Sequence, residues 1–220
     1  MTLSNPLENQ IVVPPSEAEA YLSQMSIRAA DLYEAIAAGD VAAGNLTTHH
    51  PVIAPGIERW IHSTGHLRER LADTGRWSGS DPQNRPVSTH SSGAWIIALI
   101  GGNEATGDSE SAIGPKAARS KGKATEEAAK TIPLFSLGGY RASVKTEDGP
   151  PSGNWFVLYY RDEDQVRIEV SLPAGFDGSL GQFTGWRIRV ILEPWQPEDS
   201  VRRPLDIGGQ DVDFRVEAVG

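Results

Sequence analysis

The feature that most constrains the fold is a run of twenty residues, 154–173, in which two different strand patterns follow one another. Residues 155–160 are all apolar or aromatic, and from Val166 to Leu172 apolar residues alternate with polar ones. An unbroken apolar run indicates a strand buried on both faces, whereas alternation indicates a strand with one face in solvent. The five polar residues between the runs, 161–165, are few enough to join antiparallel neighbours. The sequence therefore predicts a β-hairpin whose first arm lies inside a sheet and whose second arm has one wet face.

Two amphipathic helices are predicted before this hairpin. Ser16 and Glu19 match a capping box, and an apolar stripe with spacings of three and four residues then runs to Ile36. This helix is expected to end at Gly39, and Ser26 is a point at which it can restart. The second helix is expected over residues 57–72, where the apolar positions occupy one narrow sector: Ile57, Trp60, Ile61, Thr64, Leu67 and Leu71.

Further strands are predicted on both sides of the hairpin, at residues 87–90, 94–100, 140–146, 186–192 and 212–218. Short connections leave little room for helical crossovers, so we expect six to eight mostly antiparallel strands. The predicted fold class is α+β, with N-terminal helices followed by a mostly antiparallel β-sheet or sandwich. The helical region 1–75 and the β-rich region 76–220 are expected to form one compact domain. A polar segment near 101–131 is expected to be a flexible loop.

Composition excludes several classes of protein. With 220 residues, of which 39% are hydrophobic, the chain can bury a large core. Its net charge of -9 argues against a dedicated binder of nucleic acid. The absence of cysteine excludes disulfides, thiolate metal sites and cysteine nucleophiles. The N-terminal residues do not resemble a targeting segment, and the longest apolar run is too short to cross a membrane. We therefore expect a cytoplasmic protein with no membrane partner.

One candidate metal site lies on the second predicted helix. His62 and His66 are four residues apart, and Glu58 and Glu69 share their polar face. Two imidazoles and a carboxylate at this spacing can hold a divalent metal, which is the only cofactor we consider. However, Ser63 follows the first histidine where a zinc protease helix has glutamate. A solvated polar face is the favoured interpretation, and a metal-dependent hydrolase is the alternative.

A basic run is the second candidate site, and it consists of Lys116, Arg119, Lys121 and Lys123. Such residues can contact the phosphates of nucleic acid, a small anion or an acidic partner. No aromatic residue lies between them, which counts against a platform for stacked bases. The favoured interpretation is a solvated mobile loop, and nucleic-acid binding through residues 116–123 is the alternative.

Arginines on the predicted strands form the third candidate site: Arg167, Arg187, Arg189 and Arg215. Acidic residues alternate with apolar ones in the same strands. Mixed charges at alternating positions are typical of cross-strand pairs on a solvated sheet face. The same face is a candidate surface for a partner, because guanidinium groups bind phosphates and carboxylates.

Sequence motifs give no support for catalysis. Gly102 and Gly107 have the spacing of a phosphate-binding loop, but Asp108 occupies the lysine position. No lysine has an acidic residue or a glutamine two positions before it, as a common nuclease core requires, and no Gly-x-Ser-x-Gly sequence is present. We therefore expect a non-catalytic binding or assembly protein that acts through another protein or a nucleic-acid complex.

Overall fold

The predicted hairpin is present and lies at the centre of a sheet. A computed structural model describes residues 10–130 and 149–197 of the chain. Strand β5 (Gly153–Arg161) pairs antiparallel with β6 (Val166–Asp177), and β6 pairs antiparallel with β7 (Gln182–Ile191). β5 is buried from Gly153 to Tyr159. The prediction of a strand enclosed on both faces is therefore confirmed for β5.

Four more strands complete an open seven-stranded sheet in the described part of the chain. They are β1 (Ile11–Val13), β2 (Trp77–Ser80), β3 (Val87–His90) and β4 (Trp95–Gly101). The strand order is β1-β7-β6-β5-β4-β3-β2. The number of strands agrees with the prediction, although β1 and β2 were not expected. The predicted strands at 140–146 and 212–218 lie outside the described residues.

The sheet is mostly antiparallel but mixed. β4 pairs with β5 in parallel, and β1 pairs with β7 in parallel. Parallel neighbours need a long connection, and the chain between Gly101 and Gly153 is long enough to supply one. The expectation that short turns exclude crossovers therefore failed at this connection, which also carries a helix.

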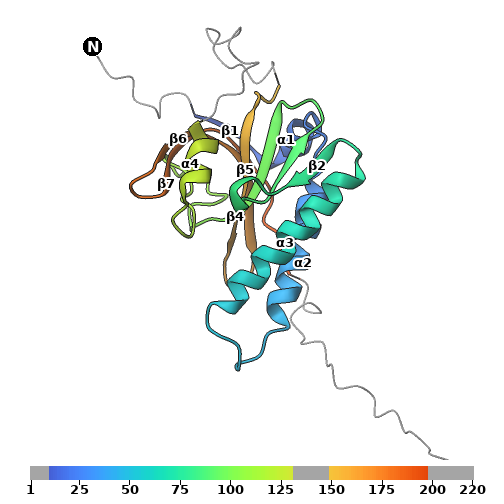
Figure 1. Cartoon of the computed structure of the whole chain (residues 1–220), viewed down its shortest axis with the longest axis vertical. Helices are drawn as coiled ribbons and strands as arrows, with labels where there is room; N and C mark the ends of the chain where they lie inside the picture. The colour runs from blue at the N-terminus through green and yellow to red at the C-terminus, as the bar shows by residue number, and fades with distance from the viewer. Residues whose placement is uncertain (1–9, 131–148, 198–220) are drawn as a thin grey trace, which may run out of the picture.

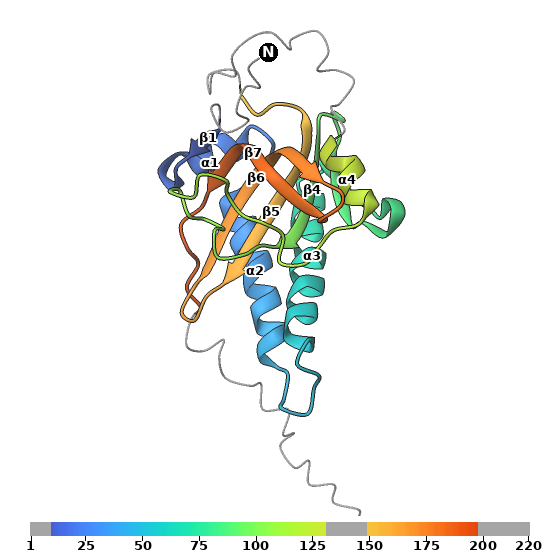
Figure 2. The same ribbon diagram turned by 90° about the vertical axis from the view of Figure 1, so that its left-hand side faces the viewer.

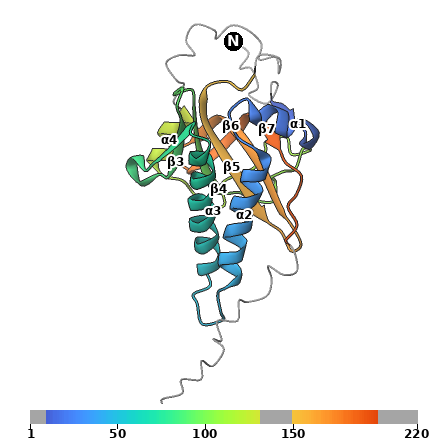
Figure 3. The same cartoon turned by 90° about the vertical axis from the view of Figure 1, so that its right-hand side faces the viewer.

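Helices cover both faces of the sheet. Helices α1 (Pro15–Ser23), α2 (Ala29–Gly44) and α3 (Ala54–Asp73) lie on one face (Figure 3). Helix α4 (Lys123–Lys130) lies on the other (Figures 1 and 2). The α+β class is thus correct, but the helices are not all N-terminal and the sheet does not close into a sandwich.

Details of the first helices differ from the sequence-based prediction. The residue that caps α1 is Pro14, and its side chain makes no capping hydrogen bond, so the capping box at Ser16 was wrong. Proline at the first helical position supplies the preset φ angle instead. The chain breaks between α1 and α2 near Ser26, which has a φ of 59°. The helix is therefore split near Ser26 as the sequence allowed, but α2 restarts at Ala29 with Arg28 as its N-cap and not at Ser26.

A continuous apolar core joins the helices α1–α3 to the sheet. Leu22, Met25 and Ile36 from the helical region are fully buried against Trp155 and Val170 of the sheet. Burying a side chain of this size contributes roughly 1.5–3 kcal/mol relative to leaving it exposed. β1 also belongs to this sheet, since it pairs in parallel with β7.

The opposite face of the sheet is buried as well, contrary to the expectation of a wet face on β6. A second core contains Phe156, Phe176, Phe183 and Trp186. The segment that connects β4 to α4 crosses in front of the sheet and covers this core (Figure 2). The indole of Trp186 donates a hydrogen bond to the carbonyl oxygen of Pro115 in that segment, at 2.9 Å.

Arg189 of β7 and Glu169 of β6 hold the covering segment in place. Their side chains are fully buried and form an ion pair, with Nη2 2.5 Å from Oε2 and Nε 3.0 Å from Oε1. The same guanidinium donates to the carbonyl oxygens of Ala105, Asp108 and Ser111. Glu169 also accepts the Gly107 amide at 2.8 Å and the Ser171 hydroxyl at 2.6 Å.

The segment 101–131 was predicted to be a flexible loop. In the structure, its described residues 101–130 are instead held against the sheet by hydrogen bonds. It contains few apolar side chains of its own. Its carbonyl groups are ordered instead by a buried guanidinium that lies about eighty residues away in sequence. The Gly107 amide, which the sequence suggested as part of a phosphate-binding motif, binds the carboxylate of Glu169.

Helix α2 continues through Gly39, where the sequence predicted that it would end. The reason is close contact with α3, since a Cβ atom on Gly39 would lie 2.5 Å from the carbonyl oxygen of Arg59. Gly39 thus allows the two helix backbones to approach, and α2 extends to Gly44. In contrast, Gly65 of α3 has no atom near the position of its missing Cβ.

These two glycines predict opposite effects of the same substitution. Gly39→Ala should lower the free energy of unfolding by about 1–3 kcal/mol, because the methyl group overpacks the helix contact. Gly65→Ala should raise it by about 0.5–1 kcal/mol, because alanine has the higher helix propensity and the site is open. Urea unfolding of both variants measures the difference, and equal effects would contradict the assigned packing.

The buried ion pair predicts a large loss of stability when its charge is removed. Glu169→Gln leaves the guanidinium of Arg189 buried without a counter-charge, which should cost about 3–5 kcal/mol. Asp162→Asn is the matched control, because Asp162 lies 3.8 Å from Arg167 on the surface. That change should cost less than about 1 kcal/mol. Urea unfolding that gave similar values for both variants would rule out the structural role of the pair.

Candidate functional site

The polar face of α3 carries the predicted metal ligands as two separate pairs. His62 Nε2 lies 3.3 Å from a carboxylate oxygen of Glu58, and His66 Nδ1 lies 3.5 Å from one of Glu69. Each histidine is thus next to its own glutamate. Within residues 10–130 and 149–197, no group of three His, Asp or Glu side chains is arranged to hold a metal ion. Metal binding at this face stays a prediction that has no third ligand to support it.

The apolar face of α3 is longer than the surface that covers it. Thr64, Leu67 and Leu71, in the second half of the helix, are buried, and the two leucines belong to the core shared with the sheet. Ile57 and Ile61, in the first half, belong to the same stripe but are exposed by 36% and 47%. Figure 3 shows the cause, since α2 and α3 run together past the end of the sheet. An apolar stripe that continues beyond its support exposes a surface suited to contact with another molecule.

The exposed stripe is part of a larger patch at the connected end of helices α2 and α3. These two helices form a helical hairpin, distinct from the β5–β6 hairpin, and we call this surface the hairpin-end patch. Five of the seven large hydrophobic residues that are exposed in the described chain belong to it: Val52, Ile53, Ile57, Trp60 and Ile61. Residues 53, 57 and 61 are each one turn apart along the helix direction, and residue 60 lies beside them. The stretch 41–57 contains no Asp, Glu, Lys or Arg. The patch is therefore apolar and carries no formal charge as far as Ile57, whereas Glu58 and Arg59 lie between Ile57 and Trp60 in the sequence.

A buried carboxylate fixes the two helices to the sheet near the patch. Asp40 of α2 accepts hydrogen bonds from Arg59 of α3, at 3.0 and 3.2 Å, and from Arg161 of β5, at 3.1 Å. Asp40 is only 6% exposed. Two guanidinium groups on one carboxylate link three elements at the point where the helices leave the sheet. The hairpin-end patch is thus carried on a rigid support.

The predicted arginine face does not form one surface. Arg189 is fully buried in its pair with Glu169 and cannot contact a partner, so this part of the prediction was wrong. Arg167 lies over the ring of Tyr160, with 5.0 Å from its guanidinium carbon to the ring centroid. Arg187 is partly buried, and Arg215 lies outside the described residues. A partner face built from these arginines is therefore not supported as it was predicted.

The basic run lies on the segment that covers the second core. Lys116, Arg119 and Lys123 are exposed, whereas Lys121 is partly buried. The Lys121 amide donates to the carbonyl oxygen of Gly181 in the β6–β7 turn, at 2.8 Å. Burial, together with the nearby charge of Arg119, lowers the pKa of Lys121. The four residues thus have different surroundings, and nucleic-acid binding through them stays a prediction.

Sequence reasoning missed the hairpin-end patch although its signal was present. The apolar sector of α3 was identified from Ile57 onward, but the pattern alone does not show which part of it a neighbouring element buries. Only the position of the sheet relative to the helix distinguishes the buried half from the exposed half.

None of the described helices combines the length and apolar character that crossing a membrane requires. Comparison with protein-family models, with curated proteins and with solved structures gives no match to this chain.

Proposed function

We propose that this chain is a non-catalytic binding or assembly protein that holds a protein partner through the hairpin-end patch. The observation that carries the proposal is the apolar stripe of α3, which continues beyond the sheet that buries its other half. Clustered apolar side chains on the surface of a folded protein are typical of interaction sites. Large side chains such as tryptophan and isoleucine also supply the buried centre of many interfaces.

The chemistry of the patch favours an apolar and uncharged partner surface. Stretch 41–57 offers no formal charge for ion pairing with a partner. Electrostatic attraction to an anionic lipid surface needs lysine or arginine, and this stretch contains neither. A groove or helix face lined by aliphatic side chains fits the spacing of Ile53, Ile57 and Ile61 along one helical face. The patch thus replaces the sheet face and the central loop as the surface that we assign to the partner.

Two alternatives remain as predictions with less support. A metal-dependent hydrolase at His62 and His66 requires a third ligand that converges with them. Nucleic-acid binding through 116–123 requires basic side chains that act together over a surface. Cytoplasmic location likewise remains a prediction from the sequence.

Charged substitutions in the patch test the proposal. The double variant Ile53→Lys with Ile57→Lys should lose partner affinity by about 30-fold or more, because loss of a hot-spot residue at the centre of an interface costs about 2 kcal/mol or more. Leu180→Lys is the matched control, since Leu180 is an exposed leucine in the β6–β7 turn, 66% accessible and outside the patch. The measurement is affinity capture from the source cells, quantified by mass spectrometry, with sedimentation velocity to detect self-association.

The proposal requires a protein, or a second copy of the chain, that both the wild type and Leu180→Lys retain and the double variant loses. Leu180→Lys should unfold within about 0.5 kcal/mol of the wild type, because its side chain is exposed. The double variant should lose no more than about 2 kcal/mol, because Ile57 is partly covered, and it should remain folded. Equal capture and equal sedimentation of all three proteins would contradict the assignment of the patch.

A further inference from the structure

A cavity lies where strand β4 extends beyond its neighbour β3. The two strands pair only at Ser88–Ile97 and Thr89–Ile96, while β4 continues to Gly101. Beyond Ile97, where β3 no longer pairs with β4, two other groups donate hydrogen bonds to the free edge of β4. The indole of Trp60 donates to the carbonyl oxygen of Leu99 at 3.1 Å, and the Ala118 amide donates to that of Gly101 at 2.9 Å. Beside this edge lies a cavity of about 270 Å³.

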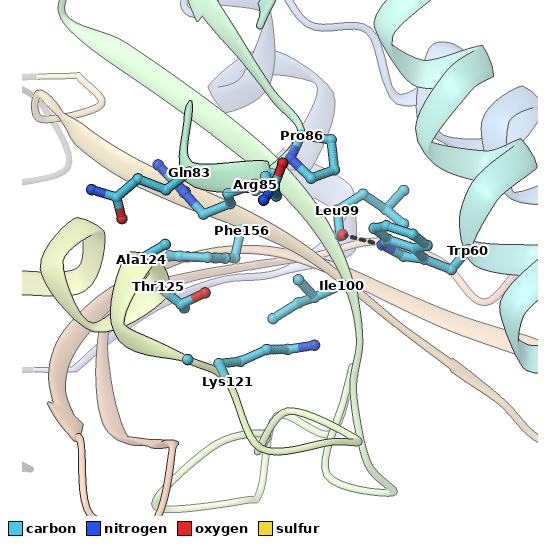
Figure 4. A pocket seen from close by; sticks show the side chains of 13 residues that line it. Trp60, Gln83, Arg85, Pro86, Leu99, Ile100, Lys121, Ala124, Thr125 and Phe156 are labelled. Atoms are coloured by element: carbon cyan, nitrogen blue, oxygen red, sulfur yellow. Dashed lines mark hydrogen bonds between the residues drawn. The ribbon is translucent and has the colours of Figure 1, made fainter. Parts of the chain in front are cut away.

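The lining of the cavity combines apolar walls with two cations. Trp60, Leu99, Ile100 and Phe156 supply large apolar surfaces. The charged side chains in the lining are Arg85 and Lys121, and no aspartate or glutamate lines the cavity. Figure 4 shows the Lys121 side chain extending along Ile100, across the cavity from Arg85. The chain has a net charge of -9, so the positive charge of this cavity is local and does not reflect the charge of the whole surface.

Arg85 has a hydrogen-bonding group that the protein leaves unused. Its Nη2 donates to Oδ1 of Asn154 at 3.2 Å, which is a neutral partner. Its Nη1 is buried and has no hydrogen-bond partner among the described residues, nor does Arg85 form an ion pair with any of them. Burial lowers the pKa of Arg85. An arginine stays charged even so, and a desolvated charge without a counter-ion is unfavourable.

The backbone that carries Arg85 is strained in the same region. Gln83 and Asn84, which also line the cavity, have φ angles of 52° and 58°. Two consecutive residues other than glycine in the left-handed region cost energy that a plain surface turn would avoid. On the opposite wall, Thr125 belongs to the first turn of α4 and its hydroxyl group points toward the cavity (Figure 4). The positive end of the α4 dipole adds to the field of the two cations.

We propose that this cavity binds a small organic anion, with an oxyanion head between Arg85 and Lys121 and a compact apolar body against Phe156, Ile100 and Trp60. A carboxylate or a phosphate pairs with the guanidinium group of Arg85 and with the ammonium group of Lys121, the two cations that line the cavity. The volume admits a single small ring and its head group, and it is below the usual range for larger ligands. This inference is independent of the partner proposed for the hairpin-end patch.

Isothermal titration calorimetry of the whole chain with three probes tests the ligand class. Benzoate and phenyl phosphate carry the two oxyanion heads on the same ring, and benzamide is the neutral counterpart of benzoate. We expect one or both anions to bind with at least about tenfold higher affinity than benzamide, because each charge-assisted hydrogen bond is worth a factor of about ten or more. The preferred anion identifies the head group. Equal affinity for benzoate and benzamide together with no affinity for phenyl phosphate, or no binding of any probe, would overturn the proposal.

Substitutions then separate a binding role from a structural one. Arg85→Met and Lys121→Met should each weaken binding of the preferred anion by about 10-fold to 100-fold. Lys123→Met is the matched control, because Lys123 is an exposed neighbour that does not line the cavity, and it should change affinity by less than about twofold. Arg85→Met should lower the midpoint of urea unfolding, since it removes the donor to the buried Oδ1 of Asn154, whereas Lys121→Met should leave the midpoint close to that of the wild type. Affinity for the preferred anion within about twofold of the wild type in both Arg85→Met and Lys121→Met would show that the two cations serve the fold alone.

Discussion

The fold depends most on the buried ion pair between Arg189 and Glu169, because it determines what covers the second face of the sheet. The guanidinium donates to two carboxylate oxygens and to three backbone carbonyl groups of the covering segment. The carboxylate also accepts a backbone amide of that segment. A buried charge pair stabilises a protein only when its remaining donors and acceptors are satisfied, and here they are. The polar segment from residue 102 to 117 is therefore ordered by hydrogen bonds to two strands rather than by its own apolar content.

This closure places the candidate binding surfaces at the margins of the sheet. With one face under α1–α3 and the other under the covering segment, no broad face of β6 or β7 remains for a partner. The two surfaces that remain share one origin. The hairpin-end patch is present because α3 is longer than the sheet below it, and the cationic cavity is present because β4 is longer than β3 beside it. In both places an element extends past the neighbour that would otherwise bury it.

How much of the structure the sequence could predict depends on how far apart in the sequence the interacting residues lie. The β5–β6 hairpin was predictable because Trp155–Tyr160 and the alternation after Val166 are local patterns. Alternation also predicted a wet face at Glu169 and Arg189, and this was wrong because a charged residue in a strand pattern does not reveal whether another segment covers it. Arg85 was missed for a related reason. It lies in a stretch rich in Gly, Pro and Ser that resembles an ordinary loop, and its isolation from carboxylates is a property of the folded chain alone. Lys121 was identified as basic, but the sequence did not separate it from the three exposed basic residues near it.

Trp60 is the one residue that the hairpin-end patch and the cavity have in common, and its geometry bears on whether the two sites influence each other. Its indole nitrogen is held by the carbonyl oxygen of Leu99, and its ring lines the cavity while 37% of its surface stays exposed. Coupling between two sites requires an element with two arrangements that each ligand favours differently. Trp60 is fixed to β4, and Asp40 of α2 links Arg59 of α3 to Arg161 of β5. Such a doubly anchored side chain has no second arrangement close in energy without breaking a hydrogen bond. If both proposed sites bind, the anchoring of Trp60 therefore favours independent binding, although the two sites share a wall.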